Sequence, residues 1–212
     1  MALRREKRRC AEIIHRLLLK EGTVVSLSSV KRTLKRTGLI PQRDGRKRWH
    51  TSGTRPKAVH PGDLVEIDTI HLMQNKTSRL YVFTLIDLAS RWAYAKAYPV
   101  ARAATSLSFV REAQQHAPFP FAHLQSDHGS EFSRYFKHMI GITHRHSRVR
   151  RPNDNAHLER FNRTIQDECL DALPKSVRAI NKALPAYLAY YNGERMHLGL
   201  DFKTPLQMIP RY

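Results

Sequence analysis

Three acidic residues have the types and the settings for metal chemistry. Asp68 lies inside the apolar run Leu64–Ile70. Asp127 follows an apolar run that ends at Leu124, and Glu159 falls one turn into an amphipathic stretch. Carboxylates held together repel one another, and a hard divalent cation removes that cost. Two such ions about 4 Å apart can activate an attacking oxygen and stabilise a leaving oxygen. These residues therefore form a hypothesis for a divalent-metal site.

Each acid also has a plainer explanation. A lone Asp at the end of a strand more often caps a turn, and Gly129 would let the backbone turn sharply just after Asp127. A lone Glu on a helix usually faces solvent. Asp87, inside Leu85–Leu88, would also qualify by composition as an acid of the site. The residues alone leave these alternatives open.

For the metal hypothesis, a helix over residues 155–169 has to present Glu159. Its polar face is spaced at i, i+4, i+8 and i+11: Asn155, Glu159, Arg163 and Gln166. The apolar positions fall on a different face: Leu158, Phe161, Ile165 and Cys169. We therefore expect the helix to bury its apolar side and to place Arg163 and Gln166 beside Glu159, where they can meet phosphates.

The overall charge predicts a polyanionic partner. Among 212 residues, 37 Lys and Arg stand against 18 Asp and Glu, for a net charge of +19 and a pI of about 10.5. The alternative is a merely soluble basic protein, but the basic residues cluster in four places: Arg4–Arg9, Lys31–Arg36, Arg43–Arg48 and Arg145–Arg151. Nucleic acid is the simplest partner for such a chain.

The first forty residues predict two short amphipathic helices. The first has one apolar face and ends near Gly22: Cys10, Ile13, Ile14, Leu17 and Leu18. Ser28 or Ser29 can cap the second helix, and Gly38 stops it. Its outer face is basic and is predicted to contact DNA: Lys31, Arg32, Lys35 and Arg36. The pair could be a helix-turn-helix, and a solvated charged helix is equally consistent with these residues.

The remaining segments define a domain plan and a compartment. We expect a helical, helix-turn-helix-like segment over residues 1–41, a basic linker rich in Pro and Gly over 42–60, and a catalytic core over 61–212. Two cysteines make no disulfide framework, so a reducing compartment fits. We find no signal peptide, and no apolar run approaches the roughly 18 residues of a membrane span. The expected location is the cytoplasm.

The apolar runs predict an α/β fold. Leu64–Ile70, Leu80–Leu88 and Trp92–Pro99 follow one another closely, which favours an antiparallel meander. Helices and strands then alternate: a helix over 105–116, a strand over 121–126, a helix over 131–140, a strand over 142–146, and helices over 155–169 and 176–191. This order predicts a mixed five-stranded sheet flanked by helices, with the small helical segment before it.

Several of these motifs carry a resemblance to a known family. The segments Leu124–Phe132 (LQSDHGSEF) and Pro152–Ile165 (PNDNAHLERFNRTI) resemble the core of the Asp-Asp-Glu transposases and retroviral-type integrases, most of all bacterial insertion-sequence transposases. Asp68, within Glu66–Thr69, matches the first acid of that family. The second and third acids match Asp127 and Glu159. Two later segments resemble the end of this domain: Tyr190–Leu200 and Lys203–Pro205.

The resemblance implies a ribonuclease-H-like fold and a reaction. It implies two Mg²⁺ or Mn²⁺ ions held by the three acids Asp68, Asp127 and Glu159. It implies cleavage at the 3′ ends of an element, followed by attack of the freed 3′-OH on target DNA. The DNA contacts would include Asn155, Arg163, Gln166 and the basic residues of the segment 143–151: Arg145, Arg148, Arg150 and Arg151. A homo-oligomer on paired ends and association with the bacterial nucleoid are implied, and a separate DNA-binding subunit is left open.

Some features depart from the family pattern. Only 31 residues separate Asp127 from Glu159, shorter than is usual by about one helical turn. Met196 stands where the closing motif usually has Pro, and the N-terminal part is short. Four histidines are interpreted as cleft or DNA-contact residues and not as a zinc site: His123, His128, His144 and His146. Two other functions stay open: an inactive DNA-binding relic or regulator, and another ribonuclease-H-like nuclease such as a resolvase.

Overall fold

The apolar runs between residues 64 and 99 form the predicted antiparallel meander. Its strands are β1 (Val65–Met73), β2 (Arg79–Asp87) and β3 (Ala93–Tyr98), and each pairs with the next. All but the first and third residues of β2 are buried, as its nearly unbroken apolar run predicts for an interior strand. The meander is therefore the rigid base from which Asp68 projects.

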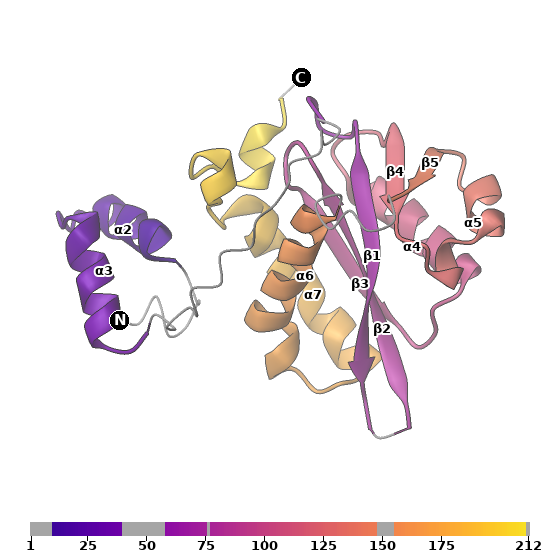
Figure 1. Cartoon of the computed structure of the whole chain (residues 1–212), viewed down its shortest axis with the longest axis horizontal. Helices are drawn as coiled ribbons and strands as arrows, with labels where there is room; N and C mark the ends of the chain where they lie inside the picture. Colours follow the sequence, from indigo (N-terminus) through magenta and orange to yellow (C-terminus); the bar gives the residue numbers. More distant parts are fainter. Residues whose placement is uncertain (1–9, 40–57, 76, 148–154, 211–212) are drawn as a thin grey trace. The chain divides into compact units, whose positions relative to one another are not determined.

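Two short parallel strands complete the sheet. β4 (His123–Ser126) pairs with β1, and β5 (Thr143–His146) pairs with β4. The order is β3-β2-β1-β4-β5, which confirms the mixed five-stranded sheet (Figure 1). This computed structural model describes residues 10–39, 58–75, 77–147 and 155–210.

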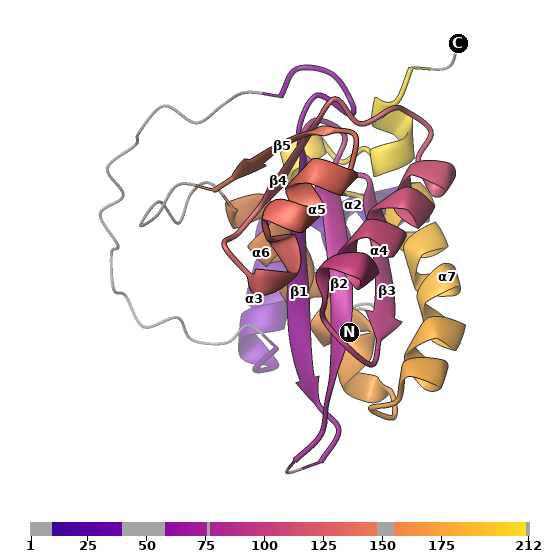
Figure 2. The ribbon, with the colours of Figure 1, turned by 90° about the vertical axis from the view of Figure 1, so that its right-hand side faces the viewer.

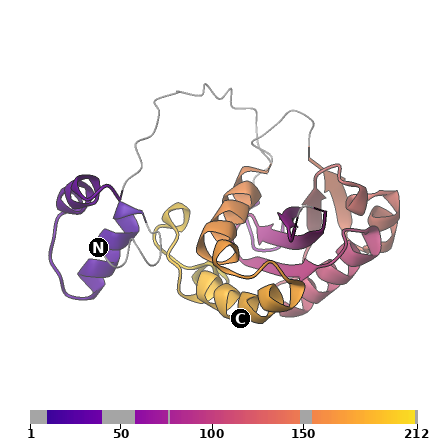
Figure 3. The same ribbon diagram turned by 90° about the horizontal axis from the view of Figure 1, so that it is seen from below.

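Helices cover both faces of this sheet. α4 (Ala103–His116) and α5 (Arg134–Met139) lie on one face (Figure 2). α6 (Ala156–Glu168) and α7 (Val177–Gly193) lie on the other, and the view from below shows the sheet between the two layers (Figure 3). Each face has its own buried apolar cluster. Within the described residues, no helix has the length and apolar character needed to cross a membrane.

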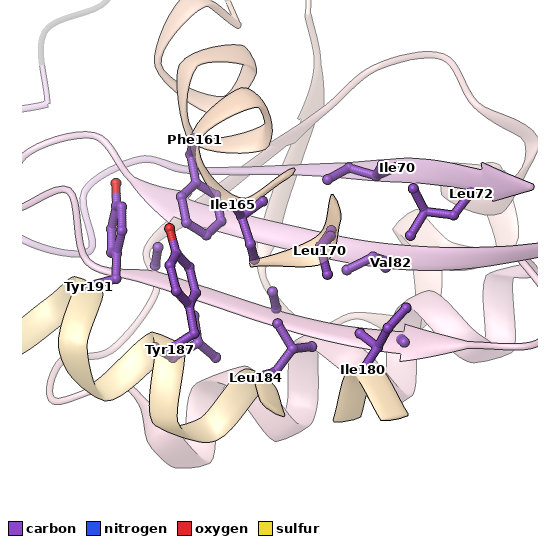
Figure 4. Packing of buried hydrophobic residues seen from close by; sticks show 14 of the residues in the cluster. Ile70, Leu72, Val82, Phe161, Ile165, Leu170, Ile180, Leu184, Tyr187 and Tyr191 are labelled. Carbon is purple, nitrogen blue, oxygen red and sulfur yellow. The ribbon is translucent and has the colours of Figure 1, made fainter. Parts of the chain in front are cut away.

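The packing of α6 fixes the helix that carries Glu159. Phe161 and Ile165 are almost fully buried, and they meet α7 and the sheet in one cluster (Figure 4). The ring of Phe161 lies edge-on to Tyr191, with 4.9 Å between the centroids. Glu168 at the end of α6 pairs with Arg195 at 3.0 Å. Because the apolar side of α6 packs into the core, the orientation of its polar face, which carries Glu159, is fixed.

The outer edge of β3 is covered by two asparagines of α7. Asn192 accepts a hydrogen bond from Ala93 N and donates one to Ala93 O, each at 2.9 Å. Asn181 accepts from Ala97 N at 2.8 Å and donates to Ala97 O at 2.9 Å. The two residues lie eleven positions apart, so they share a helix face. The carboxamides therefore replace the missing neighbour strand at two points.

The two N-terminal helices form a compact unit of their own. α2 (Ala11–Lys20) and α3 (Leu27–Arg36) pack through one small apolar cluster: Ala11, Ile14, Val30 and Leu34. The predicted stop at Gly22 is confirmed, since its φ of 81° is left-handed. The predicted cap at Ser28 or Ser29 is wrong, because the side chain of Ser26 accepts the bond from Ser29 N. The boundary predicted at 41 lies outside the described residues, whereas residues 58–75 are described. Both boundaries, at 41 and at 60, stay a prediction.

The helix predicted over residues 131–140 is shorter than expected. Residues Ser130–Phe132 form a 3₁₀ turn, and α5 begins only at Arg134. Ser133 separates them because its ψ of 176° is extended. The shortening buries Glu131 and Phe132 against α4, where the hydroxyl of Ser106 donates to Glu131 O at 3.0 Å. A short connection between β4 and β5 also agrees with the short interval before Glu159.

The Asn192 pair gives a stability prediction. Asn192→Ala leaves both polar groups of Ala93 buried without a partner, and each such group costs about 1–3 kcal/mol. We expect a loss of about 2 kcal/mol or more in the free energy of unfolding, measured with urea. Asn181→Ala is the matched control, because Asn181 is half-exposed and water can replace its amide. Equal losses in both variants would contradict the buried-pair explanation.

Candidate active site

The pairing of β1 with β4 places two acids side by side. Ile67 is the register partner of Ser126 in this parallel pair. Asp68 and Asp127 are the next residues along the two segments. Neighbouring strands lie about 4.8 Å apart, so the two backbones reach the same edge of the sheet together. The predicted convergence of Asp68 with Asp127 is therefore present.

Asp68 is held by two donors and feels two other acids. Its carboxylate accepts from Thr69 N at 2.8 Å and from the side-chain amide of Asn162 at 2.9 Å. Burial, with the nearby charges of Asp127 and Glu131, raises the pKa of Asp68 to about 6 against these two hydrogen bonds. Ionisation of Asp68 is therefore unfavourable beside these acids, and a bound cation would reduce that cost.

Asn162 was not singled out from the sequence, although it connects α6 with β1. Its side-chain oxygen accepts from the hydroxyl of Thr84 on β2 at 2.6 Å, while its nitrogen donates to Asp68. It is 8% exposed and lies three residues after Glu159 on α6. Its spacing from Glu159 was the signal that the sequence offered, because i and i+3 positions are neighbours on a helix, but its burial is visible only in the structure.

Glu159 lies on the same face of α6 and is exposed. The face is tied to the sheet on both sides of it: Asn155 accepts from the Gln125 side chain on β4 at 3.1 Å, and Asn162 donates to Asp68. Besides burial, the acids that chiefly raise the pKa of Asp68 are Asp127 and Glu131. Within the described residues no three His, Cys, Asp or Glu side chains gather as a metal-ligating group. The role of Glu159 as third ligand stays a prediction.

Glu131 is an acid of this region that the sequence reasoning missed. Its carboxylate and that of Asp127 both approach Gly129, whose N–H donates to Asp127 Oδ1 at 2.9 Å. A Cβ placed on Gly129 would lie 2.8 Å from Glu131 Oε2 and 3.1 Å from Asp127 Oδ1. Gly129 has an ordinary φ of −58°. A side chain at this position would push the Glu131 carboxylate aside, so glycine leaves that carboxylate its place beside Asp127. The backbone φ itself does not require glycine.

Asp87, which by composition was another candidate for the site, has a structural role. Its carboxylate is fully buried and accepts from Gly62 N at 2.9 Å and from Ser90 N and Oγ at 2.7 Å each. It anchors the turn after β2, next to the start of β1 at Val65. It is a structural residue, with its oxygens already engaged.

Histidines support the end of β4. Ser126 Oγ donates to Asp127 O at 2.8 Å and lies 3.0 Å from His144 Nε2. His146 Nδ1 donates to the same Asp127 carbonyl at 2.7 Å, and His128 stacks on His146 at 4.8 Å. Burial lowers the pKa of His144 to about 4, so this ring is neutral at physiological pH. The histidines thus brace the backbone of Asp127.

The predicted DNA-contact residues are placed unevenly. Arg32, Lys35 and Arg36 are exposed on α3, whereas Lys31 pairs with Glu12 at 2.7 Å. Arg163 is exposed on α6, and the Gln166 amide donates back to Asn162 O. Arg145 is half-buried on β5. Three others lie outside the described residues: Arg148, Arg150 and Arg151.

This fold and this pair of acids define the class of protein. A mixed sheet of order β3-β2-β1-β4-β5, with acids on β1 and after β4, is a ribonuclease-H-like catalytic core. Residues 58–152 and residues 140–205 each match a family model described as Integrase core domain. The chain belongs to this family of integrase and transposase cores.

Known proteins agree with this assignment. The chain is 31% identical over 165 residues to a transposase for insertion sequence element IS904 of Lactococcus lactis, covering 72% of this chain but only 61% of that protein. A chain of the simian T-cell lymphotropic virus intasome superposes with a TM-score of 0.63, at 18% identity over 93% of this chain and 74% of that one. The HTLV-2 integrase catalytic core in complex with magnesium gives 0.57, at 18% identity over 73% of this chain and 100% of that core. These structures establish the fold.

Asp68 predicts a pH dependence of stability in the metal-free protein. Its pKa in the folded state is about 6, above the ordinary 3.8, so ionisation costs folding free energy. That cost is fully present above about pH 6 and disappears as the pH falls from about 6 towards 3.8. Asp68→Asn should therefore be more stable than the parent by about 1–3 kcal/mol above the window, and this gain should vanish below it.

Urea unfolding of both proteins in a chelator, on either side of that window, makes the measurement. Both proteins share His144 and the other titrating groups, so their difference isolates Asp68. A gain that does not change with pH would contradict the raised pKa of this carboxyl.

Proposed function

We propose that this protein is a DNA transposase or integrase that cleaves the 3′ ends of an element and joins them to target DNA. The observation that carries the proposal is the convergence of Asp68 and Asp127 at one edge of an integrase-type core. The similarity to an insertion-sequence transposase supports the same activity.

The residues present fit a divalent cation. The donors would be carboxylate oxygens of Asp68, Asp127 and Glu159, the ligand type that Mg²⁺ and Mn²⁺ prefer. Burial, together with repulsion from Asp127 and Glu131, raises the pKa of Asp68, and a nearby positive charge offsets both effects. Two ions are proposed, and when bound they lower the barrier to attack on phosphorus and stabilise the leaving 3′ oxygen. The similar HTLV-2 core was solved in complex with magnesium.

The protein's own contribution is positioning. Thr69 N and Asn162 hold the two oxygens of Asp68, and Thr84 fixes the amide of Asn162. In the first step, water oxygen bonds to phosphorus and the bond to the 3′ oxygen breaks, which frees a 3′-OH. In the second step, that 3′ oxygen bonds to a target phosphorus and displaces another 3′ oxygen. No bond to the protein forms in either step.

The DNA would lie against basic surface. We propose contacts from α3 and from Arg163, which are exposed, and from Arg145 and the basic residues that follow it. The charge of +19 suits two duplexes, the element end and the target. A homo-oligomer on paired ends and a place at the chromosome follow from that substrate. The division into an N-terminal DNA-binding segment, a linker and a core belongs to the same proposal.

Asp127→Asn tests the activity. The change keeps size and hydrogen bonding but removes a charge, so joining of labelled element ends to a plasmid in Mg²⁺ or Mn²⁺ should fall at least about 100-fold. DNA binding in a gel shift should stay within about twofold. An active parent and a silent variant support the proposal.

Other results separate the alternatives. The inactive relic would be favoured if the parent binds DNA in a salt-sensitive way but neither nicks nor joins it, whether or not a separate DNA-binding subunit is added. Nicking of branched DNA without joining would favour a resolvase-like nuclease. Glu159→Gln in the same assay tests the third acid, which should behave as Asp127→Asn does.

The basic face of α3 makes a second prediction. Lys35→Ala with Arg36→Ala should weaken binding to any duplex and reduce the slope of log K against log salt by about two, one for each phosphate that is no longer neutralised. Lys31→Ala is the matched control, because Lys31 is already paired with Glu12. An unchanged slope in the double variant would show α3 to be a solvated helix.

A further inference from the structure

Glu131 is a largely buried acid close to Asp127. It lies in the 3₁₀ turn after β4 and exposes 9% of its surface. Only its backbone is engaged, since its carbonyl accepts from Ser106 Oγ. In the part of the chain that the structure describes, its side chain has no hydrogen bond and no ion pair. A carboxylate that lies beside another carboxylate, without a cationic side chain as partner, is a setting that a bound cation stabilises.

The side chain is aimed at Asp127. The place where a Cβ of Gly129 would stand is 2.8 Å from Glu131 Oε2 and 3.1 Å from Asp127 Oδ1. The distance between these two carboxylate oxygens is therefore less than the sum of those two distances. Glycine keeps the space between them open. Neither Lys nor Arg pairs with either carboxylate among the described residues, so the protein itself does not neutralise them.

We propose that Glu131 is a fourth carboxylate of the site and helps to hold a divalent cation together with Asp127. The inference rests on the proposed metal-dependent function and deepens it. Glu131 and Asp127 come from one short segment and already face each other in the DNA-free chain, whereas Glu159 is exposed on α6. A cation therefore binds at Glu131 and Asp127 before DNA arrives.

Titration of the full-length, DNA-free protein with Mn²⁺, followed by calorimetry, tests this. Glu131→Gln should raise the Kd for Mn²⁺ by about 10–100-fold, the usual cost of disturbing a metal site. Asp127→Asn should do at least as much. The matched control is Glu194→Gln, which makes the same chemical change at an exposed residue after α7 and should leave the Kd unchanged.

Melting temperatures distinguish a metal role from a structural one. Without metal, Glu131→Gln should raise the melting temperature, because it removes a charge that repels Asp127 and Asp68. Addition of Mn²⁺ should raise the melting temperature of Glu131→Gln by less than it raises that of the parent. A variant that melts lower without metal and keeps the parent's Kd would make Glu131 structural and overturn the inference.

Gly129→Ala adds a variant that keeps both acids. Its methyl group would displace the Glu131 carboxylate, so Mn²⁺ should bind at least about 10-fold more weakly. Normal binding in Gly129→Ala and Glu131→Gln, with weakened binding in Asp127→Asn, overturns the role of Glu131 alone. Normal binding in Asp127→Asn overturns the proposed metal centre as well. A parent that binds no Mn²⁺ without DNA overturns the early loading of the cation.

Discussion

The parallel contact between β1 and β4 is the constraint on which the candidate site depends. It consists of three residue pairs, from Val65 with Leu124 to Ile67 with Ser126. A slip by one residue would turn Asp127 to the other face of the sheet, away from Asp68. The hydrogen bonds of His144 and His146 around Ser126, and the 2.7 Å bond from Ser147 N to Ser126 O, hold this short strand in register. The chemistry of two carboxylates thus relies on the backbone order of a four-residue strand.

Around that strand, acidic side chains lie close enough together to repel one another. Asp68 feels the charges of Asp127 and Glu131 within a largely buried setting, and this works against folding in the absence of a cation. Two apolar layers, one on each face of the sheet, supply the stability that tolerates the repulsion. Asn162 joins the two requirements, because it is anchored on packed α6 and reaches the acid on β1.

Periodicity predicted most of this architecture, because burial on one face leaves a mark in the sequence. The five strands and the helices that became α4, α6 and α7 followed from that mark. Glu131 and Asn162 were not found, since a polar residue next to an apolar one looks the same whether it faces solvent or another acid. The interruption of the helix at Ser133 was equally hidden, because no Pro or Gly marks it. The position of Asp127 was predicted, but the space that Gly129 preserves is visible only in three dimensions.

The two asparagines on α7 have a consequence for how copies of the chain can meet. An open strand edge invites another strand to add to it, which leads to swapped or aggregated sheets. At Ala93 and Ala97 strand addition is blocked, because the amides of Asn192 and Asn181 already bond to the outward backbone groups. A strand of a second copy therefore cannot pair with these two residues, and the β3 edge of the sheet is protected there by side chains of the same chain.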